Sequence, residues 1–289
     1  MRQFRVGPSW LWSIVLAVFW IGLSCSSAKA KEKMKPEDLV SKHLAALGSP
    51  EARAAAKTRV LDGPAAVTFR IGGTGRSDGK AVFLSEGRKV RLLLNFDHPE
   101  YPAEQLMYDA KRVSVGLIRP SIRSRLSQFI YDNEGFLTEG LMGGATSLGW
   151  SLADREGRKA RLDYRGLKEV EGTKLHELRY IPRSVLDDFQ ILLYFEPETF
   201  RHVLSVYRLR IPHFMAGKPA DSGKMRESYW KMTEEFDDFK TVDGLTLPHA
   251  YRLVLNFEGE VGPFLAIWEA KFSRVVHNQQ FSADVFGLQ

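Results

Sequence analysis

Two short motifs contain residue types that could carry out chemistry. The glycines Gly72, Gly73 and Gly75 could cradle a phosphate group, but no Lys-Ser or Lys-Thr pair follows them and strand-like runs flank them, which favours a hairpin turn. Ser147 lies in the stretch GATSLG, which misses the spacing of a nucleophile elbow by one residue and lacks its strand–turn–helix context. We therefore expect no catalytic residue and no enzyme, although catalytic groups that are far apart in sequence escape this test.

Histidine side chains are common metal ligands, and the chain has seven of them. None lies in an HExxH motif or another short ligand spacing. Four fall in or beside strand-like runs, where a hydrogen-bonded structural histidine is the better interpretation: His176, His202, His213 and His249. The sequence therefore predicts neither a metal ion nor another cofactor.

An acidic group occurs in the stretch EEFDDF. Its four carboxylates could bind calcium, but the stretch lacks the glycine-bearing loop that calcium sites use. The alternation with Phe236 and Phe239 favours the solvated face of a strand instead. This interpretation places on that face Glu234, Glu235, Asp237 and Asp238.

The first thirty residues have the layout of a secretory signal peptide. Arg2 and Arg5 precede an apolar run of 14 residues, 10–23, and small residues lead to Ala30. That run is shorter than the roughly 20 residues that a membrane-spanning helix needs, so we expect cleavage after Ala30. Attachment of a lipid at Cys25 is the alternative, although a glycine stands three residues before it, where a lipoprotein signal has a branched apolar residue.

The position of the charges decides which partners are plausible. The whole sequence has 289 residues and a net charge of +6, with 41 Lys plus Arg against 35 Asp plus Glu. Cleavage after Ala30 removes three basic residues and no acidic one, which leaves 259 residues with a net charge of +3 and no cysteine. So small an excess gives no basic footprint for nucleic acid. We expect a cysteine-free periplasmic protein.

The rest of the chain switches between helical and strand-like patterns. Pro36, two acidic residues and an apolar stripe predict a helix that ends at Gly48. Period-two alternation over residues 65–117 predicts about five strands. Helical spacing returns after Ser121, the expected cap of a helix in an insert of about residues 120–150, which glycines break into short pieces. Alternation resumes after Asp154 and gives about six more strands, with a hairpin turn at Asp243 and Gly244.

These patterns predict a mainly β fold. About 10 or 11 strands, with no repeat and no long polar linker, favour one domain over residues 31–289. An antiparallel sheet of that many strands must curl, and its concave face must be covered. The N-terminal helix and the central insert are the elements available to cover it, so we expect an incomplete, half-barrel sheet with the insert as its lid.

Three arginines, Arg119, Arg123 and Arg125, lie close to Phe129 and Tyr131 in this insert. They would suit a helix on a membrane surface or an amphipathic helix whose apolar side packs on the sheet. The second interpretation is favoured.

Three stretches carry a family resemblance: HELRYIPRS from His176, ILLYFEPETFRHVLSVYRLR from Ile191 and EEFDDFKTVDGLTLPHAYRLVLNF from Glu234. Together with the C-terminal FSRVVHNQQFSADVF, they resemble the periplasmic lipoprotein-carrier family of the LolA/LolB type. The resemblance implies an incomplete antiparallel barrel closed by helices around a hydrophobic cavity that receives acyl chains. It also implies that an arginine near the start of the sheet holds the lid closed, and Arg88 and Arg91 are the nearest candidates.

The favoured hypothesis is a periplasmic, non-enzymatic protein that binds a lipid or the acyl chains of a lipoprotein. The expected lining of the site is Leu126, Phe129, Ile130, Leu137, Leu141 and Met142 from the lid, and Leu92, Leu94, Ile191, Leu193, Phe195, Tyr251 and Leu253 from the sheet. The alternative is an envelope sensor or structural module that uses the same fold to bind a partner protein, such as an envelope membrane protein.

Overall fold

A computed structural model describes residues 34–73, 75–183, 189–211, 228–259 and 262–287. The predictions for the signal peptide, for Cys25 and for His213 concern residues outside these ranges. The account below concerns the unit that begins at Met34.

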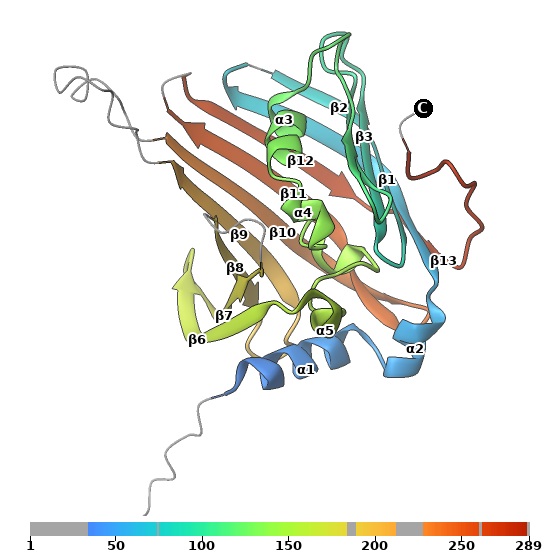
Figure 1. Ribbon diagram of the computed structural model, residues 1–289, viewed down its shortest axis with the longest axis vertical. Coiled ribbons are helices and arrows are strands. Elements are labelled where there is room, and N and C mark those ends of the chain that lie inside the picture. Colours follow the sequence, from blue (N-terminus) through green and yellow to red (C-terminus); the bar gives the residue numbers. More distant parts are fainter. Residues whose placement is uncertain (1–33, 74, 184–188, 212–227, 260–261, 288–289) are drawn as a thin grey trace, which may run out of the picture. The chain divides into compact units, whose positions relative to one another are not determined.

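The described strands form one antiparallel sheet (Figure 1). They are β1 (Thr58–Ile71), β2 (Gly75–Glu86), β3 (Lys89–Phe96), β4 (Ala103–Tyr108), β5 (Val113–Val115), β6 (Arg161–Val170), β7 (Thr173–Ile181), β8 (Phe189–Phe195), β9 (His202–Ile211), β10 (Ser228–Val242), β11 (Leu245–Glu258), β12 (Phe264–Lys271) and β13 (Arg274–His277). Their order is β5-β4-β3-β2-β1-β12-β11-β10-β9-β8-β7-β6, and β13 pairs with β1. Since β5 and β6 end this order, the sheet is open, and the predicted half-barrel is confirmed.

The sheet has thirteen strands within the described residues, more than the 10 or 11 that the sequence predicts. Two of the thirteen, β5 and β13, are only three and four residues long. Alternation needs at least about four residues to be visible in a sequence, so strands this short are easily missed.

The alternating pattern decides which side chains face inward. The buried residues of β3 are the apolar set Val90, Leu92, Leu94 and Phe96, and its polar residues are partly or fully exposed. The β10–β11 hairpin turns at Asp243 and Gly244, whose φ angles are 51° and 76°. Two successive positive φ angles are what the type I′ hairpin turn requires, so the Asp-Gly turn is confirmed.

The helices lie before the sheet and in the segment between β5 and β6. They are α1 (Pro36–Leu47), α2 (Pro50–Ala55), α3 (Arg125–Asp132), α4 (Gly135–Thr138), the short 3-10 helix η1 (Gly144–Thr146) and α5 (Arg155–Arg158). The predicted first helix, with Gly48 at its C-terminus, is confirmed, whereas the six-residue α2 is too short to show a helical stripe in the sequence. Among the described residues, no helix is both long enough and apolar enough to span a membrane.

The N-cap of α3 differs from the prediction. The Ser124 hydroxyl accepts a hydrogen bond from the Ser127 backbone N–H at 2.8 Å, so Ser124 is the cap. The prediction of Ser121 is wrong, because Ser121 has a φ of 64° and lies in a turn that precedes the helix. An N-cap residue needs an extended backbone, which Ser124 has.

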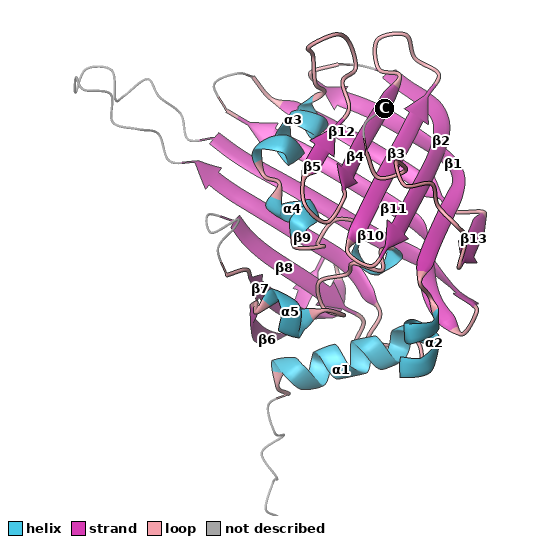
Figure 2. Cartoon of the chain, turned by 45° about the vertical axis from the view of Figure 1, so that its right-hand side comes forward, coloured by secondary structure: helices cyan, strands magenta, loops and turns pink. Residues whose placement is uncertain are grey.

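The insert, which runs from residue 120 to residue 158 in the structure, lies against the concave face of the sheet. Figures 1 and 2 show α3 and α4 across the inner side of the curled sheet and α1 along one end of it. Helix α3 buries Leu126, Phe129 and Ile130 and leaves Tyr131 about half exposed. The interpretation of this helix as amphipathic and packed on the sheet is therefore confirmed.

Candidate functional site

The apolar residues predicted to line a ligand site lie together under the insert. All thirteen belong to one hydrophobic cluster, and none is more than 5% exposed. The six from the insert and the seven from the sheet therefore fill the concave face with side chains. The insert occupies the space in which a ligand was predicted.

Several aromatic residues that the sequence prediction omits complete this cluster. The Phe129 ring stacks on Trp230 of β10 at 4.8 Å and on Phe136 of α4 at 5.6 Å between ring centroids. Phe136 in turn meets Phe189 and Tyr207 edge to face, at 5.0 and 4.9 Å. Phe136 belongs to a one-turn helix, which is too short for helical spacing to mark its buried side.

A carboxylate lies at the centre of this apolar site. Glu234 of β10 has no exposed surface, and its carboxylate accepts hydrogen bonds from Tyr251 Oη at 2.7 Å, Tyr207 Oη at 2.8 Å and the Gly143 backbone N–H at 2.7 Å. Removal from water raises the pKa of Glu234 to about 7, and the three donors only partly offset that rise. The two tyrosines belong to the sheet and Gly143 belongs to the insert.

The prediction that Glu234 lies on a solvated strand face is therefore wrong, whereas its neighbours Glu235, Asp237 and Asp238 are partly or fully exposed. A strand alternates faces with a period of two, so Glu234 shares a face with the buried Phe236. This parity is the signal in the sequence that would have placed the carboxylate inside.

The backbone of the insert is shaped to meet Glu234. Gly143 and Gly144 have φ angles of 77° and 50°, in the left-handed region that glycine adopts without strain. A Cβ at Gly144 would lie 2.8 Å from the Phe236 ring, closer than carbon atoms pack. These two glycines allow the Gly143 N–H to reach the carboxylate.

A second buried carboxylate holds the other part of the insert. Glu104 of β4 is 1% exposed and accepts hydrogen bonds from the hydroxyls of Ser127 in α3, at 2.6 Å, and of Tyr101. The Trp268 ring N–H donates to the Tyr101 oxygen at 2.8 Å. Burial raises the pKa of Glu104, while its hydroxyl partners lower it. Glu104 thus connects α3 to the sheet through side chains.

A buried arginine bonds the insert from β1, near the start of the sheet. The Arg59 guanidinium is 5% exposed and donates to the carbonyl oxygens of Ala145, at 2.8 Å, and Thr146, at 3.1 Å. Its Nε donates to His277 of β13 at 3.1 Å, and the other His277 nitrogen lies 2.8 Å from Asp243. Burial lowers the pKa of Arg59 to about 10, so it remains charged at neutral pH. Sequence reasoning missed this residue.

Of the two arginines named as lid-holding candidates, Arg88 contacts the insert and Arg91 contacts the C-terminal segment. Arg88, in the β2–β3 turn, donates from Nε to the Asp154 carboxylate at 2.7 Å, and both side chains are more than a third exposed. Asp154 lies near the end of the insert. Arg91 donates to the carbonyl oxygen of Val285 at 2.8 Å, which is in the C-terminal segment and not in the insert.

The described histidines from the prediction make hydrogen bonds to protein atoms. His176 lies 2.7 Å from Tyr164 Oη, His202 lies 3.0 Å from Ser205 Oγ, and His249 lies 3.1 Å from the Leu247 carbonyl oxygen. The fully buried His43 accepts from the Trp150 ring N–H at 3.0 Å, and burial lowers its pKa to about 4. Across the described ranges, no group of three or more His, Cys, Asp or Glu side chains is arranged to hold a metal ion.

A cavity of about 350 Å³ borders the Arg59 contact. Arg59, Ala145 and Trp150 line it together with side chains from α1, α2 and the start of β11. Ser147, the serine of the near-miss nucleophile motif, also lines it, and its hydroxyl accepts a hydrogen bond from the Gly149 N–H at 3.0 Å. Open space therefore lies directly beside the point where β1 holds the insert.

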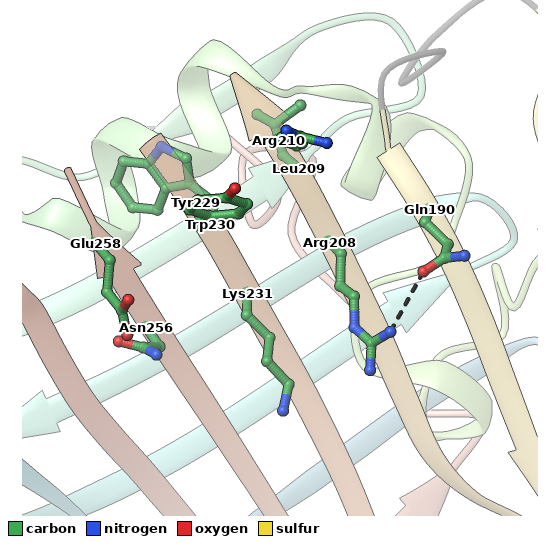
Figure 3. Close-up of a pocket in the computed structure, with 9 residues that line it drawn as sticks. All are labelled: Gln190, Arg208, Leu209, Arg210, Tyr229, Trp230, Lys231, Asn256 and Glu258. Atoms are coloured by element: carbon green, nitrogen blue, oxygen red, sulfur yellow. Dashed lines mark hydrogen bonds between the residues drawn. The ribbon is translucent and has the colours of Figure 1, made fainter. Parts of the chain in front are cut away.

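A second hollow lies on the outer face of the sheet, over β8–β11, and encloses about 460 Å³ (Figure 3). Arg208 and Lys231 stand directly opposite each other on β9 and β10 in this hollow. Arg208 donates to Gln190 at 3.4 Å, and within the described residues neither cation forms an ion pair. The hollow is also lined by Arg210 and by the acidic Glu258, so its basic side chains outnumber its acidic one and favour an anion.

The comparison with known proteins gives fold relationships only. No family model matches the chain, and no curated protein matches it. A DUF1329 family protein from Desulfovibrio piger is 11% identical with a TM-score of 0.46, over 88% of this chain and 98% of that chain. A candidate outer membrane lipoprotein-sorting protein domain from Vibrio parahaemolyticus is 13% identical with a TM-score of 0.45, over 87% and 97%. The second of these neighbours is described as a lipoprotein-sorting domain, the same term that describes the family the sequence resembles.

The MucA/MucB complex of Pseudomonas aeruginosa is a further structure with a similar chain. That chain is 9% identical with a TM-score of 0.23, over 84% of this chain and 100% of that chain.

Proposed function

We propose that this protein binds the acyl chains of a lipid or a lipoprotein on the concave face of its sheet, and that the insert moves aside to admit them. The observation that carries this proposal is that the insert contributes apolar side chains to the concave face but no strand to the sheet. The insert can therefore leave without breaking the hydrogen bonds between strands. Acyl chains would then replace its leucine, phenylalanine and methionine side chains at little cost in apolar burial.

The polar contacts of the insert support this proposal because they are separate hydrogen bonds and not part of a strand ladder. Arg59 binds two carbonyl groups, Glu234 binds one N–H group, and Glu104 binds the Ser127 hydroxyl. In addition, the Leu148 N–H donates to Ser85, the Trp150 ring N–H donates to His43, and the Tyr180 hydroxyl donates to Glu139. Arg59 lies on the first strand, so it fits the lid-holding role that the family resemblance implies better than Arg88 or Arg91. In this proposal, release of Arg59 opens the insert.

The proposed setting is the periplasm, reached through a signal peptide over residues 1–30. There the protein would take part in lipoprotein sorting or lipid transport without catalysing a reaction. The intact mass of the exported protein tests this setting, because cleavage after Ala30 and lipidation at Cys25 give different masses.

Purified protein and a fluorescent acyl probe test the binding function. We expect lipid to co-purify in native mass spectrometry and the probe to bind saturably. Phe129→Asp places a charge in the apolar cluster and should weaken probe binding at least about tenfold. Tyr131→Asp is the matched control, because Tyr131 is 49% exposed on the same helix, and it should change nothing. Absence of both co-purified lipid and probe binding in the wild type would refute the proposal.

The outer hollow favours a second candidate function, an interaction module that binds an acidic segment of a partner protein. Arg208 and Lys231 in this hollow would supply the complementary charge. The two functions respond to different variants. Arg208→Glu with Lys231→Glu should abolish partner binding and spare the acyl probe, whereas Phe129→Asp should have the opposite effect.

A further inference from the structure

The Glu234 carboxylate accepts hydrogen bonds both from the sheet and from the insert. Tyr207 on β9 and Tyr251 on β11 flank it and donate from the sheet. The third donor, the Gly143 N–H, comes from the insert at 2.7 Å. All three contacts lie in a region without solvent access, because Glu234 has no exposed surface.

Movement of the insert would remove only one of these three donors. The two tyrosines would remain in place, since they belong to strands that pair on both sides. One oxygen, Oε1, would keep its bond from Tyr251 and lose its bond from Gly143. The carboxylate would then face the ligand space with an acceptor position open.

A carboxylate with an open position in an apolar site has a strong chemical preference. Leaving a buried charge short of a hydrogen bond is costly, so a ligand that supplies an N–H group is favoured. A ligand carboxylate at the same place would add a second negative charge and is disfavoured. The apolar residues around Glu234 bind the chain of either ligand equally well.

We infer that Glu234 makes the site selective for amphiphiles that carry an N–H donor at the head of the acyl chain, an ammonium or an amide group, over free fatty acids. The inference rests on the proposed acyl-binding function and names its ligand class. The ligand N–H takes the place of the Gly143 N–H, while the Tyr207 and Tyr251 hydroxyls hold the carboxylate. An ammonium group is the strongest such donor because its bond to the carboxylate is charge-assisted.

Three probes with the same twelve-carbon chain test the selectivity: dodecylamine, dodecanamide and dodecanoate. Each displaces a neutral fluorescent acyl probe from the full mature chain at about pH 8, above the pKa of Glu234. We expect dodecylamine to bind about tenfold more tightly than dodecanoate, with dodecanamide between them. If the amine and the acid bind equally well, the inference fails and the proposed function stands. If none of the probes binds, the proposed function itself fails.

Variants assign the preference to one side chain. Glu234→Gln should reduce the amine-to-acid ratio to about one, because it removes the charge and keeps the shape of the side chain. Glu235→Gln is the matched control, since Glu235 is the next residue on β10, faces outward and pairs with Arg252. Tyr207→Phe leaves the carboxyl group in place and removes one donor, so it should increase the ratio at a pH where Glu234 is ionised. If the amine-to-acid ratio is unchanged in Glu234→Gln, or falls equally in Glu235→Gln, the preference does not come from Glu234.

Discussion

Two parts of the insert, α3 (the α3 end) and the stretch around η1 (the η1 end), are fastened to the sheet by different chemistry. At the α3 end, Glu104 bonds the hydroxyl of Ser127, so the contact depends on a side chain of the insert. At the η1 end, Arg59 and Glu234 bond backbone groups of Ala145, Thr146 and Gly143. The contact at the α3 end therefore depends on the side chain at position 127, whereas the contacts at the η1 end depend on the backbone conformation.

This difference indicates which end controls opening. Helix α3 has two turns and satisfies much of its backbone internally, so it can move as a unit. The η1 end has one 3-10 turn and relies on charged side chains of the sheet to satisfy three backbone groups. Loss of those charged partners should loosen the η1 end, whereas loss of the Ser127 contact should leave it closed.

The largest effect is expected for Arg59→Met. The variant leaves the buried carbonyl groups of Ala145 and Thr146 without a donor, which should lower the free energy of unfolding by about 4 kcal/mol. Amide hydrogen exchange should rise over residues 143–150, and uptake of the acyl probe should become faster. Arg91→Met is the control, because Arg91 contacts Val285 and no residue of the insert. If amide hydrogen exchange at the η1 end is unchanged in Arg59→Met, the η1 end does not control opening.

The next effect is the pH dependence that Glu234 contributes. Burial raises its pKa from an ordinary 4.5 to about 7, so the folded protein holds this proton more tightly than the unfolded chain. The resulting stability is present below about pH 4.5 and is lost as the pH rises through 7, a change of about 3 kcal/mol. Glu234→Gln removes this change. Urea denaturation of the wild type and of Glu234→Gln between pH 5 and pH 8 measures the change. The difference between their free energies of unfolding should depend on pH.

The comparison with Glu234→Gln is needed because other groups near the site titrate. Burial lowers the pKa of His43 and His202, so these histidines destabilise the folded state as the pH falls, opposite in sign to Glu234. Burial raises the pKa of Tyr207 and Tyr251, which therefore stay neutral. Their contributions cancel in the difference between the two proteins. A difference that is constant over the pH range would show that Glu234 does not titrate there.

A smaller effect is expected at the α3 end. Ser127→Ala removes the 2.6 Å hydrogen bond to Glu104, which keeps its bond from Tyr101, and should lower the free energy of unfolding by about 1–2 kcal/mol. Amide hydrogen exchange should rise within α3 but not at residues 143–147. Gln128→Ala on the exposed side of α3 is the control. Equal increases at both ends would mean that the insert opens as one body.

The sequence predicts the apolar part of this site because apolar periodicity is local. Leu126, Phe129 and Ile130 follow helical spacing, and Leu92 and Leu94 alternate along a strand, so each set indicates its own buried face. The polar contacts depend on partners far apart in the chain. Arg59 meets carbonyl groups 86 and 87 residues away, and the first four residues of β1 are all buried, so no alternation marks it.

The smallest effect is expected for Arg88→Met, a variant of an arginine that the sequence singles out. Its ion pair with Asp154 joins two side chains that are 46% and 37% exposed, and exposed pairs contribute less than about 1 kcal/mol. Asp154 also lies after η1 in the chain, so this pair holds a later part of the insert than Arg59 does. Hydrogen exchange at residues 143–150 and acyl-probe uptake should match the wild type. If Arg88→Met instead opens the insert as widely as Arg59→Met, the backbone contacts at η1 are not what keeps it closed.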